Sequence, residues 1–411
     1  MRFAHLSSSA PLIMKAILKK LIRNTFLWIL VAMVLGFVAG TFANYHVAVG
    51  LVTVRTVFST IVNFMIPIIV LGMVAPALAR LLSGGTKLIL ISVLVIYGVH
   101  IVAAVFGVGT GYAFSGLFEG MTGDFEARNQ LPSSLITLNM PPLMPPLAAV
   151  VLGILIGISA IATKSAKFTE LLDDFHKMTK FIIAKVFMPI IPFLIFGVFG
   201  VLAYETSVLA NLSSFGLLLL ITSGVTLVFL VLMWIVATVY VRKNPFPVIK
   251  SYTKPYLMAF ATMSGAATMP LIIRELDKNP QIDKRVTDAV LPMFTNIMMP
   301  AVMIMGTFLA VTISAIVYGA APPVWSVVLF AFMVVMITGG VGAVPGGSAA
   351  MLALLAGEHL GFSDLSIGIF LAVWFITNGI NTLVNVGGDG PVYWSLSKHI
   401  EKNKETFTFR A

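Results

Sequence analysis

One carboxylate stands alone in a long apolar stretch near the end of the chain. Between Asp364 and Lys398 the only charged side chain is that of Asp389, and Asn385 precedes it by four residues, which places both on one face of a helix. A charge at membrane depth costs roughly 2.5–3.5 kcal/mol, so such a group normally faces a cavity and binds something. Carboxylate and carboxamide oxygens suit an alkali cation or a proton better than a transition metal. A structural alternative is that Asp389 caps a helix broken at the two preceding glycines.

The composition is that of a polytopic membrane protein. Hydrophobic residues make up 59% of the chain and charged residues 10%, whereas a soluble domain carries about 25% charged residues. No Asp, Glu, Lys or Arg occurs between residues 289 and 357. The absence of cysteine excludes disulfides, thiolate catalysis and cysteine-bound metal. The six histidines form no recognisable metal cluster or nucleophile–base pair, so we expect neither an enzyme nor an organic cofactor.

The basic residues sort to one side of a predicted set of eight spanning helices. We expect these helices near residues 25–44, 49–79, 88–116, 143–163, 186–204, 215–241, 286–315 and 365–397. Two further apolar segments, 247–277 and 325–357, would each enter and leave on one side. Of the 26 Lys and Arg residues, only Arg55 and Arg128 then fall on the opposite side. The positive-inside rule makes the basic side cytoplasmic, together with both termini, an amphipathic segment 1–24 and a tail 399–411. The formal charge of +10 therefore reflects topology and does not indicate nucleic-acid binding.

Small residues and prolines interrupt both of these further segments. The first has small and hydroxylated residues from Thr262 to Thr268, followed by Pro270, and the second has five glycines and Pro345 between Thr338 and Ala350. Each pattern predicts two short helices that meet at a non-helical tip. Such a tip is tolerated at membrane depth where it is buried or lines a cavity, and its backbone groups can bind a substrate or an ion. The alternative is a pair of ordinary helices that are kinked or packed closely through small residues.

The order of these parts resembles the dicarboxylate/amino acid:cation symporter family, the bacterial and archaeal relatives of excitatory amino acid transporters. Residues 343–347 (AVPGG) are similar to the family's second tip, residues 385–389 (NVGGD) to its eighth-helix ion motif, and residues 263–270 to its first tip. The resemblance implies an all-α protein of eight transmembrane helices and two re-entrant hairpins, assembled as a homotrimer. It also implies an elevator-type movement of a transport part, mainly residues 83–142 and 211–398, against a scaffold, mainly residues 25–82 and 143–210.

The resemblance further implies two sets of binding residues. Those for the substrate are Ser264, Gly265, Val344, Pro345, Gly346, Gly347, Trp374, Asn378, Asn381, Thr382 and Asn385. Those for the coupling cation, Na+ or H+, are Asn385, Asp389, Asn296, Phe294 and Thr338. No metal is expected beyond such a Na+ ion.

Several positions depart from the family pattern. Asn378 and Asn381 stand where the carriers of glutamate and aspartate have an Asp and an Arg. An amide does not replace the bidentate contact that a guanidinium makes with a carboxylate, so we expect an uncharged or weakly polar small carboxylate to bind better than aspartate. The seventh helix lacks the family's Asp, although Asn296 and Pro300 predict a break there.

His100 and Arg55 are the remaining ionisable groups at membrane depth. Histidine can change charge near physiological pH, so His100 could carry a coupling proton. The alternative, which we favour, is a hydrogen bond to a neighbouring helix. Arg55 is expected to reach the outer headgroups with its guanidinium.

The sequence thus predicts cation-coupled symport of a small carboxylate or amino acid across the inner membrane of a bacterium or archaeon. Its partners are the substrate, the lipid bilayer and two further copies of the chain. An uncoupled facilitator, an anion channel or a sensor with the same fold is the alternative function.

Overall fold

The described part of the chain is helical. The computed structural model describes residues 25–82, 87–119, 121, 130–163, 165–205, 212–284, 286, 290–341 and 347–403, and no strand occurs among them. The predicted amphipathic segment 1–24 and residues 404–411 of the predicted tail lie outside the described residues. The long apolar runs of the sequence therefore form α-helices, as expected for segments in contact with lipid.

The helices agree with the predicted spans to within a few residues. They are α2 (Thr25–Thr41), α3 (Tyr45–Leu82), α4 (Lys87–Glu119), α5 (Pro146–Ala162), α6 (Ala166–Ile182), α7 (Met188–Glu205), α8 (Leu212–Val241), α9 (Phe246–Thr262) and α10 (Gly265–Leu276). They continue with α12 (Leu291–Ile297), α13 (Pro300–Tyr318), α14 (Val324–Val341), α15 (Gly347–Leu360) and α16 (Asp364–Lys402).

Six helical segments within the described residues are long and apolar enough to cross a membrane. They are Tyr45–Pro76, Ile91–Glu119, Ala166–Glu205, Phe215–Val241, Pro300–Tyr318 and Asp364–Lys402. Two other predicted spans correspond to α2 and α5, which are apolar but have 17 residues each, at the lower end of the length that spans a bilayer. The protein is therefore a multi-pass membrane protein, and the number of eight crossings stays a prediction.

One helix was missed by the sequence analysis. The segment before the predicted span 186–204 is not a connection but the helix α6, which begins after Ser165 and continues through a π-helical turn (Ile183–Phe187) into α7. The Ser165 hydroxyl accepts a hydrogen bond of 3.3 Å from the Phe168 N–H and so caps the first turn of α6. Lys and Asp residues interrupt the apolar pattern of α6, which hid the helix from a search for uninterrupted apolar runs.

The segment 247–277 forms two helices joined by a tight turn. Helix α9 ends at Met263, whose φ of 50° is left-handed, and the Ser264 hydroxyl accepts a hydrogen bond of 3.3 Å from the Ala267 N–H at the start of α10. Helices α9 and α10 pack against each other, and so do α14 and α15 in the second segment. The predicted tip of the second segment, residues 342–346, lies outside the described residues. Two helices form in each segment, as the Gly and Pro pattern predicts, and their return to one side of a membrane stays a prediction.

The predicted seventh helix is broken in its middle. Met298 and Met299 have extended or irregular backbone angles, with ψ values of 108° and 62°, between the end of α12 and the start of α13. Pro300 begins α13, where its missing N–H leaves no hydrogen bond unmade. The break predicted from Asn296 and Pro300 is thus found two residues after Asn296.

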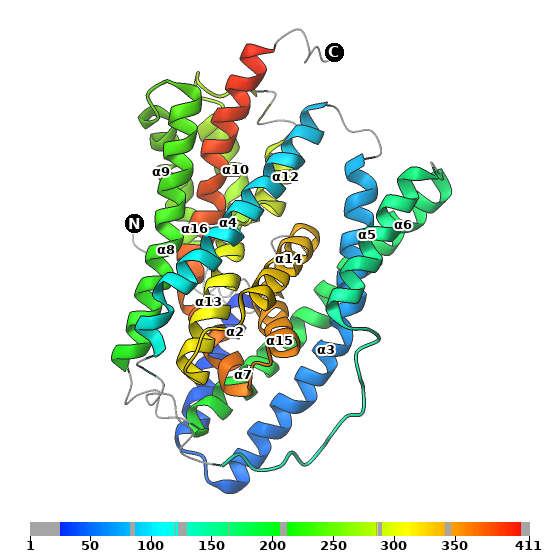
Figure 1. Ribbon diagram of the computed structural model, residues 1–411, viewed down its shortest axis with the longest axis vertical. Coiled ribbons are helices and arrows are strands. Elements are labelled where there is room, and N and C mark those ends of the chain that lie inside the picture. The colour runs from blue at the N-terminus through cyan, green and yellow to red at the C-terminus, as the bar shows by residue number, and fades with distance from the viewer. Residues whose placement is uncertain are drawn as a thin grey trace, which may run out of the picture.

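The helices pack in two neighbouring groups (Figure 1). Helix α16 runs beside α8 along the length of the molecule and also contacts α9, whereas α3 contacts α5, α6 and α7 on the other side. Helices α13, α14 and α15 lie between these groups, and α14 contacts α3 while α15 and α16 contact α7. The predicted division into scaffold and transport parts stays a prediction.

Candidate functional site

A small cavity lies where three interrupted parts of the fold meet the continuous helix α16. Its volume is about 60 Å³, which is room for a few water molecules. The lining residues come from the turn between α9 and α10, from the break between α12 and α13, from the first turn of α15, and from the middle of α16. Non-helical backbone at Met263, Ser264, Met298 and Met299 thus forms part of the cavity wall, as expected where irregular backbone is tolerated inside a membrane protein.

Most of the predicted substrate residues line this cavity. They are Ser264, Gly265, Trp374, Asn378, Asn381, Thr382 and Asn385. Gly347 begins α15, and Val344, Pro345 and Gly346 lie outside the described residues. The structure therefore brings together residues from the first tip and from α16 that are more than a hundred positions apart in the sequence.

Seven further lining residues were not among the predicted site residues. They are Met263, Thr295, Met298, Met299, Val302, Ser348 and Val386. Five of them are apolar residues of types that are common throughout a membrane protein, so the sequence alone does not mark them as binding residues. The Pro300 signal for a helix break could have located Met298 and Met299, since residues at such a break project into the space that the break opens.

The amide of Asn381 offers one free acceptor inside the protein. The Thr377 hydroxyl donates to the Val373 carbonyl at 2.7 Å and therefore accepts from Asn381 Nδ2, which lies 3.2 Å away. This bond fixes the orientation of the amide, and Oδ1 of Asn381 is buried without a hydrogen-bond partner in the described structure. A ligand that donates a hydrogen bond would satisfy this oxygen.

Side chains from two other helices hold the break between α12 and α13. His100 Nε2, on α4, accepts a hydrogen bond of 3.0 Å from the Met299 N–H, and Asn385 Oδ1, on α16, accepts one of 2.9 Å from the Ala301 N–H. His100 is completely buried, and its Nδ1 has no partner among the described residues. The hydrogen bond to a neighbouring helix is the contact expected if His100 has a structural role, and its role as a proton carrier stays a prediction.

Asp389 lies in the interior, one turn beyond the cavity along α16. Its side chain is completely buried, and neither carboxylate oxygen has a hydrogen-bond partner in the described part of the chain. Helix α16 is continuous from Asp364 to Lys402, so the alternative that Asp389 caps a broken helix is wrong. Asp389 is not among the residues that line the cavity, whereas Asn385, four residues earlier, is.

The other predicted cation residues lie on α12 and α14. Phe294 is buried and its ring lies 5.3 Å from the ring of Tyr393, which follows Asp389 by one turn of α16. Thr338 is buried near the end of α14, which contacts α12. Asn296 lies in α12, and its side chain is outside the described structure. No group of three or more His, Asp or Glu that could hold a metal ion occurs among the described residues.

Arg55 forms an ion pair that the sequence did not predict, and the expected position of its guanidinium near the outer headgroups stays a prediction. Its guanidinium forms an ion pair with Asp364 at 2.7 Å, and only 11% of the Arg55 side chain is exposed. The sequence could not show this partner because Asp364 begins a helix more than 300 residues further along the chain.

A cavity lined by amides and hydroxyls at the meeting point of interrupted helices is the arrangement found in secondary transporters. The chain belongs to the sodium:dicarboxylate symporter family, whose model matches residues 26–397. This match confirms the resemblance inferred from the two tips and the motif around Asp389. The family consists of transporters, which agrees with the expectation of a carrier and not an enzyme.

Individual relatives are similar over part of their length. Neutral amino acid transporter A of Bos taurus is 31% identical over 153 residues, which cover 37% of this chain and 28% of the relative. Human excitatory amino acid transporter 2 is 31% identical over 163 residues, covering 39% and 27%. An excitatory amino acid transporter of Caenorhabditis elegans is 27% identical over 251 residues, covering 58% and 49%. The chain spans less than half the length of these relatives.

Proposed function

We propose that the protein is a Na+-coupled symporter for a small carboxylate that carries no second negative charge. The observation that carries this proposal is the cavity between α9, α10, α12, α13, α15 and α16, whose described lining residues include Ser, Thr and Asn but no charged residue. Family membership supports the cation-coupled transport and the choice of Na+. The homotrimer, the elevator movement, the cytoplasmic termini and the inner-membrane location belong to the same proposal.

The polar groups of the cavity favour a substrate with both an acceptor and a donor. The carboxylate of the substrate would lie near the hydroxyls and backbone N–H groups of the first tip at Ser264 and of the first turn of α15 at Ser348. The buried Oδ1 of Asn381 would accept a hydrogen bond from a hydroxyl or ammonium group of the same substrate. A hydroxy acid or a neutral amino acid meets both requirements. One of the relatives is named a neutral amino acid transporter, which agrees with this substrate class.

A second negative charge on the substrate would be costly. None of the described cavity residues is Lys or Arg, so a second carboxylate would be desolvated without a partner. Leaving one buried charge unpaired typically costs about 3–5 kcal/mol, and each 1.4 kcal/mol is tenfold in affinity. Aspartate and glutamate should therefore bind at least a hundredfold more weakly than a neutral substrate of similar size.

The coupling cation is assigned to Asp389. A completely buried carboxylate whose oxygens lack hydrogen-bond partners is satisfied by a bound cation, and oxygen ligands suit a hard ion such as Na+. Asn385 lies one turn away and already accepts a hydrogen bond from Ala301, so it would connect the cation site with the break between α12 and α13. Asp389→Asn should abolish coupled uptake while the protein still assembles.

Uptake into proteoliposomes tests this proposal. The panel contains neutral amino acids, hydroxy acids, monocarboxylates and dicarboxylates, each measured under a Na+ gradient, a proton gradient and neither. We expect saturable uptake of a neutral member under the Na+ gradient and loss of that uptake in Asp389→Asn. Equal uptake with and without any gradient, or wild-type coupling in Asp389→Asn, would contradict the proposal.

An uncoupled facilitator is the second candidate. It is favoured by one observation: the neutral side chains of His100 and Asn385 already satisfy the backbone at the break between α12 and α13, so the described structure there is complete without an ion. Saturable counterflow that does not depend on Na+ or on pH would identify this function. A conductance that does not saturate with substrate would identify a channel.

A further inference from the structure

Two buried polar side chains on neighbouring helices lack hydrogen-bond partners. Asp389, on α16, and Tyr252, on α9, are both completely buried. Neither the Asp389 oxygens nor the Tyr252 hydroxyl makes a hydrogen bond within the described residues. About nine-tenths or more of buried polar groups in proteins have a partner, so two unsatisfied groups in one place indicate a ligand between or beside them.

The two side chains are neighbours. Gly390 follows Asp389, and a Cβ atom placed on Gly390 would lie 2.9 Å from Cε2 of Tyr252, so the Tyr252 ring packs directly against this turn of α16. No hydrogen bond joins the Tyr252 hydroxyl to the Asp389 carboxylate within the described structure.

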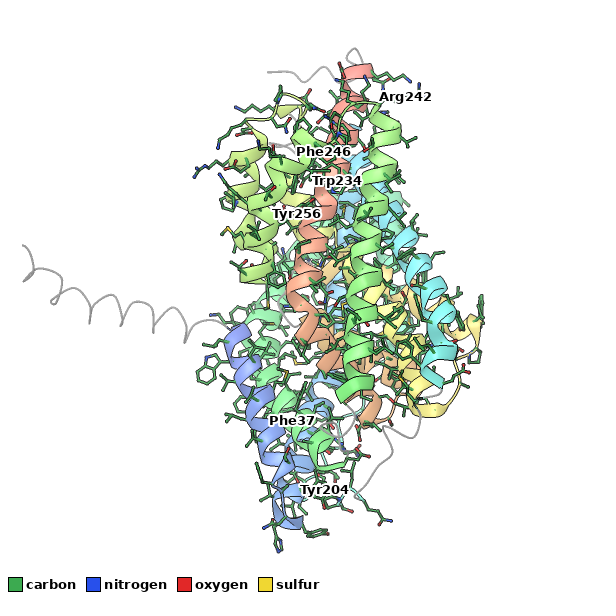
Figure 2. The ribbon with its side chains drawn as sticks, turned by 90° about the vertical axis from the view of Figure 1, so that its left-hand side faces the viewer. Phe37, Tyr204, Trp234, Arg242, Phe246 and Tyr256 are labelled. Atoms are coloured by element: carbon green, nitrogen blue, oxygen red, sulfur yellow. The ribbon has the colours of Figure 1, made fainter. Side chains whose placement is uncertain are left out.

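Two nearby tyrosines, Tyr256 and Tyr393, have hydrogen-bond partners for their hydroxyls. The Tyr256 hydroxyl accepts a hydrogen bond of 3.1 Å from Trp234 Nε1, and the two side chains lie beside each other in Figure 2. The Tyr393 hydroxyl donates to the Leu291 carbonyl at 3.3 Å. Both of these hydroxyls therefore have a structural partner, and Tyr252 does not.

We propose that the Tyr252 hydroxyl and the Asp389 carboxylate together bind Na+, so that α9 supplies a ligand of the cation site. The proposal rests on the transport function proposed above and adds a residue to its cation site. One cation and one carboxylate leave the buried site electrically neutral, which removes the main cost of burying Asp389.

This ligand would link the cation to the wall of the substrate cavity. Helix α9 leads from Tyr252 directly to Met263 and Ser264, which line the cavity. A cation that bridges Tyr252 and Asp389 holds α9 against α16, and loss of the cation frees α9 to move. The position of the first tip would thus depend on whether Na+ is bound.

Tyr252→Phe tests the proposal, with Tyr256→Phe as the matched control on the same helix. Binding of Na+ to the purified protein is measured calorimetrically by titration with NaCl at constant ionic strength, kept with choline chloride, and in parallel at two pH values. We expect Tyr252→Phe to raise the half-saturating Na+ concentration about tenfold or more and Tyr256→Phe to leave it unchanged. Substrate preference at saturating Na+ should not change in Tyr256→Phe.

The possible failures can be told apart. A Tyr252→Phe protein that assembles normally and binds Na+ like the wild type overturns the assignment of Tyr252 only, because Asp389→Asn still tests the transport proposal. Absence of Na+ binding by the wild type, with a proton-dependent signal instead, overturns both this assignment and Na+ as the coupling ion. If Tyr252→Phe does not assemble, Tyr252→Leu, which also removes the hydroxyl, is titrated and decides in the same way.

Discussion

The Arg55 guanidinium lies 2.7 Å from the Asp364 carboxylate and ties α3 to the first turn of α16. Asp364 is half exposed, whereas Arg55 is almost buried. Glu205, at the end of α7, interacts electrostatically with both, and Arg55 Nη1 and Glu205 Oε2 are buried without hydrogen-bond partners in the described structure. Three charges from three helices therefore meet where α16 begins.

The first prediction concerns this charge cluster. Asp364→Asn should lower the free energy of unfolding by about 1 kcal/mol or less, because exposed ion pairs contribute little. Arg55→Ala should cost more, roughly 1–3 kcal/mol, because it leaves Glu205 partly buried without a compensating charge. Thermal unfolding in detergent of both variants and the double variant checks this order. Equal losses of unfolding free energy in the two single variants would show that Arg55 does not stabilise the Glu205 charge.

The second prediction concerns substrate charge. Asn381→Arg places a guanidinium in the cavity wall and should shift preference from neutral substrates towards dicarboxylates by a hundredfold or more. Competition of labelled neutral substrate by aspartate measures the shift. Asn381→Gln serves as the control, since it keeps the amide and should not favour aspartate. Tight, stereoselective aspartate binding by the wild type would contradict the prediction.

The third prediction separates the two roles of His100. His100→Leu removes the acceptor of the Met299 N–H and should lower stability by about 1–3 kcal/mol, the cost of one unsatisfied buried donor. His100→Gln keeps an acceptor but cannot carry a proton in this pH range. If His100 is structural, His100→Gln restores much of the stability and leaves the pH dependence of uptake unchanged. Loss of that pH dependence in His100→Gln would instead identify a proton carrier.

The fourth prediction concerns the contact between α2 and α7. A Cβ atom at Gly36 would overlap the carbonyl oxygen of Phe196 across the contact, whereas one at Gly50 would meet no atom within 4 Å. Gly36→Ala should therefore destabilise the protein by roughly 1–3 kcal/mol through overpacking. Gly50→Ala, also within a helix, should be neutral or stabilising by up to about 1 kcal/mol. The thermal unfolding midpoints of the two variants are compared, because both add one methyl group, at Gly36 against a neighbouring helix and at Gly50 into free space.

The fifth prediction concerns topology. If both helix pairs return to the side from which they entered, a cysteine at Ser264 should react with a membrane-impermeant thiol reagent from the cytoplasmic side, and one at Ser348 from the outside. The chain has no native cysteine, so each variant reports a single position. A reaction pattern that shows either pair crossing completely would refute the eight-crossing architecture.

Apolar runs made the helix positions predictable, and the exceptions have physical reasons. Helix α6 carries charges within its pattern, so its existence depends on packing against α3 and not on hydrophobicity alone. The ion pair of Arg55 joins residues far apart in sequence, and only the folded arrangement of α3 and α16 reveals it. The break before Pro300 was visible because proline has one preferred place in a helix.

The sequence pattern also predicted part of the cavity. Asn378, Asn381, Thr382 and Asn385 have helical spacing and polar side chains in an apolar context, so they identify one face of α16. Met298, Met299 and Val302 have ordinary membrane side chains and became visible as lining residues only through the position of the break. Tyr252 could not be identified because its lack of a partner is a property of the folded interior.

Helix α16 is one uninterrupted rod of 39 residues, about 58 Å at the usual rise per residue and nearly twice the thickness of a hydrocarbon core. Its first residue pairs with Arg55 of α3, and near its other end Glu401 lies 3.5 Å from Lys243, just beyond α8. The cavity residues and Asp389 lie between these two anchors, and Pro391 removes one backbone hydrogen bond of α16 just beyond Asp389. Any movement of α16 relative to α3 or to the segment after α8 must therefore break one of these two ion pairs.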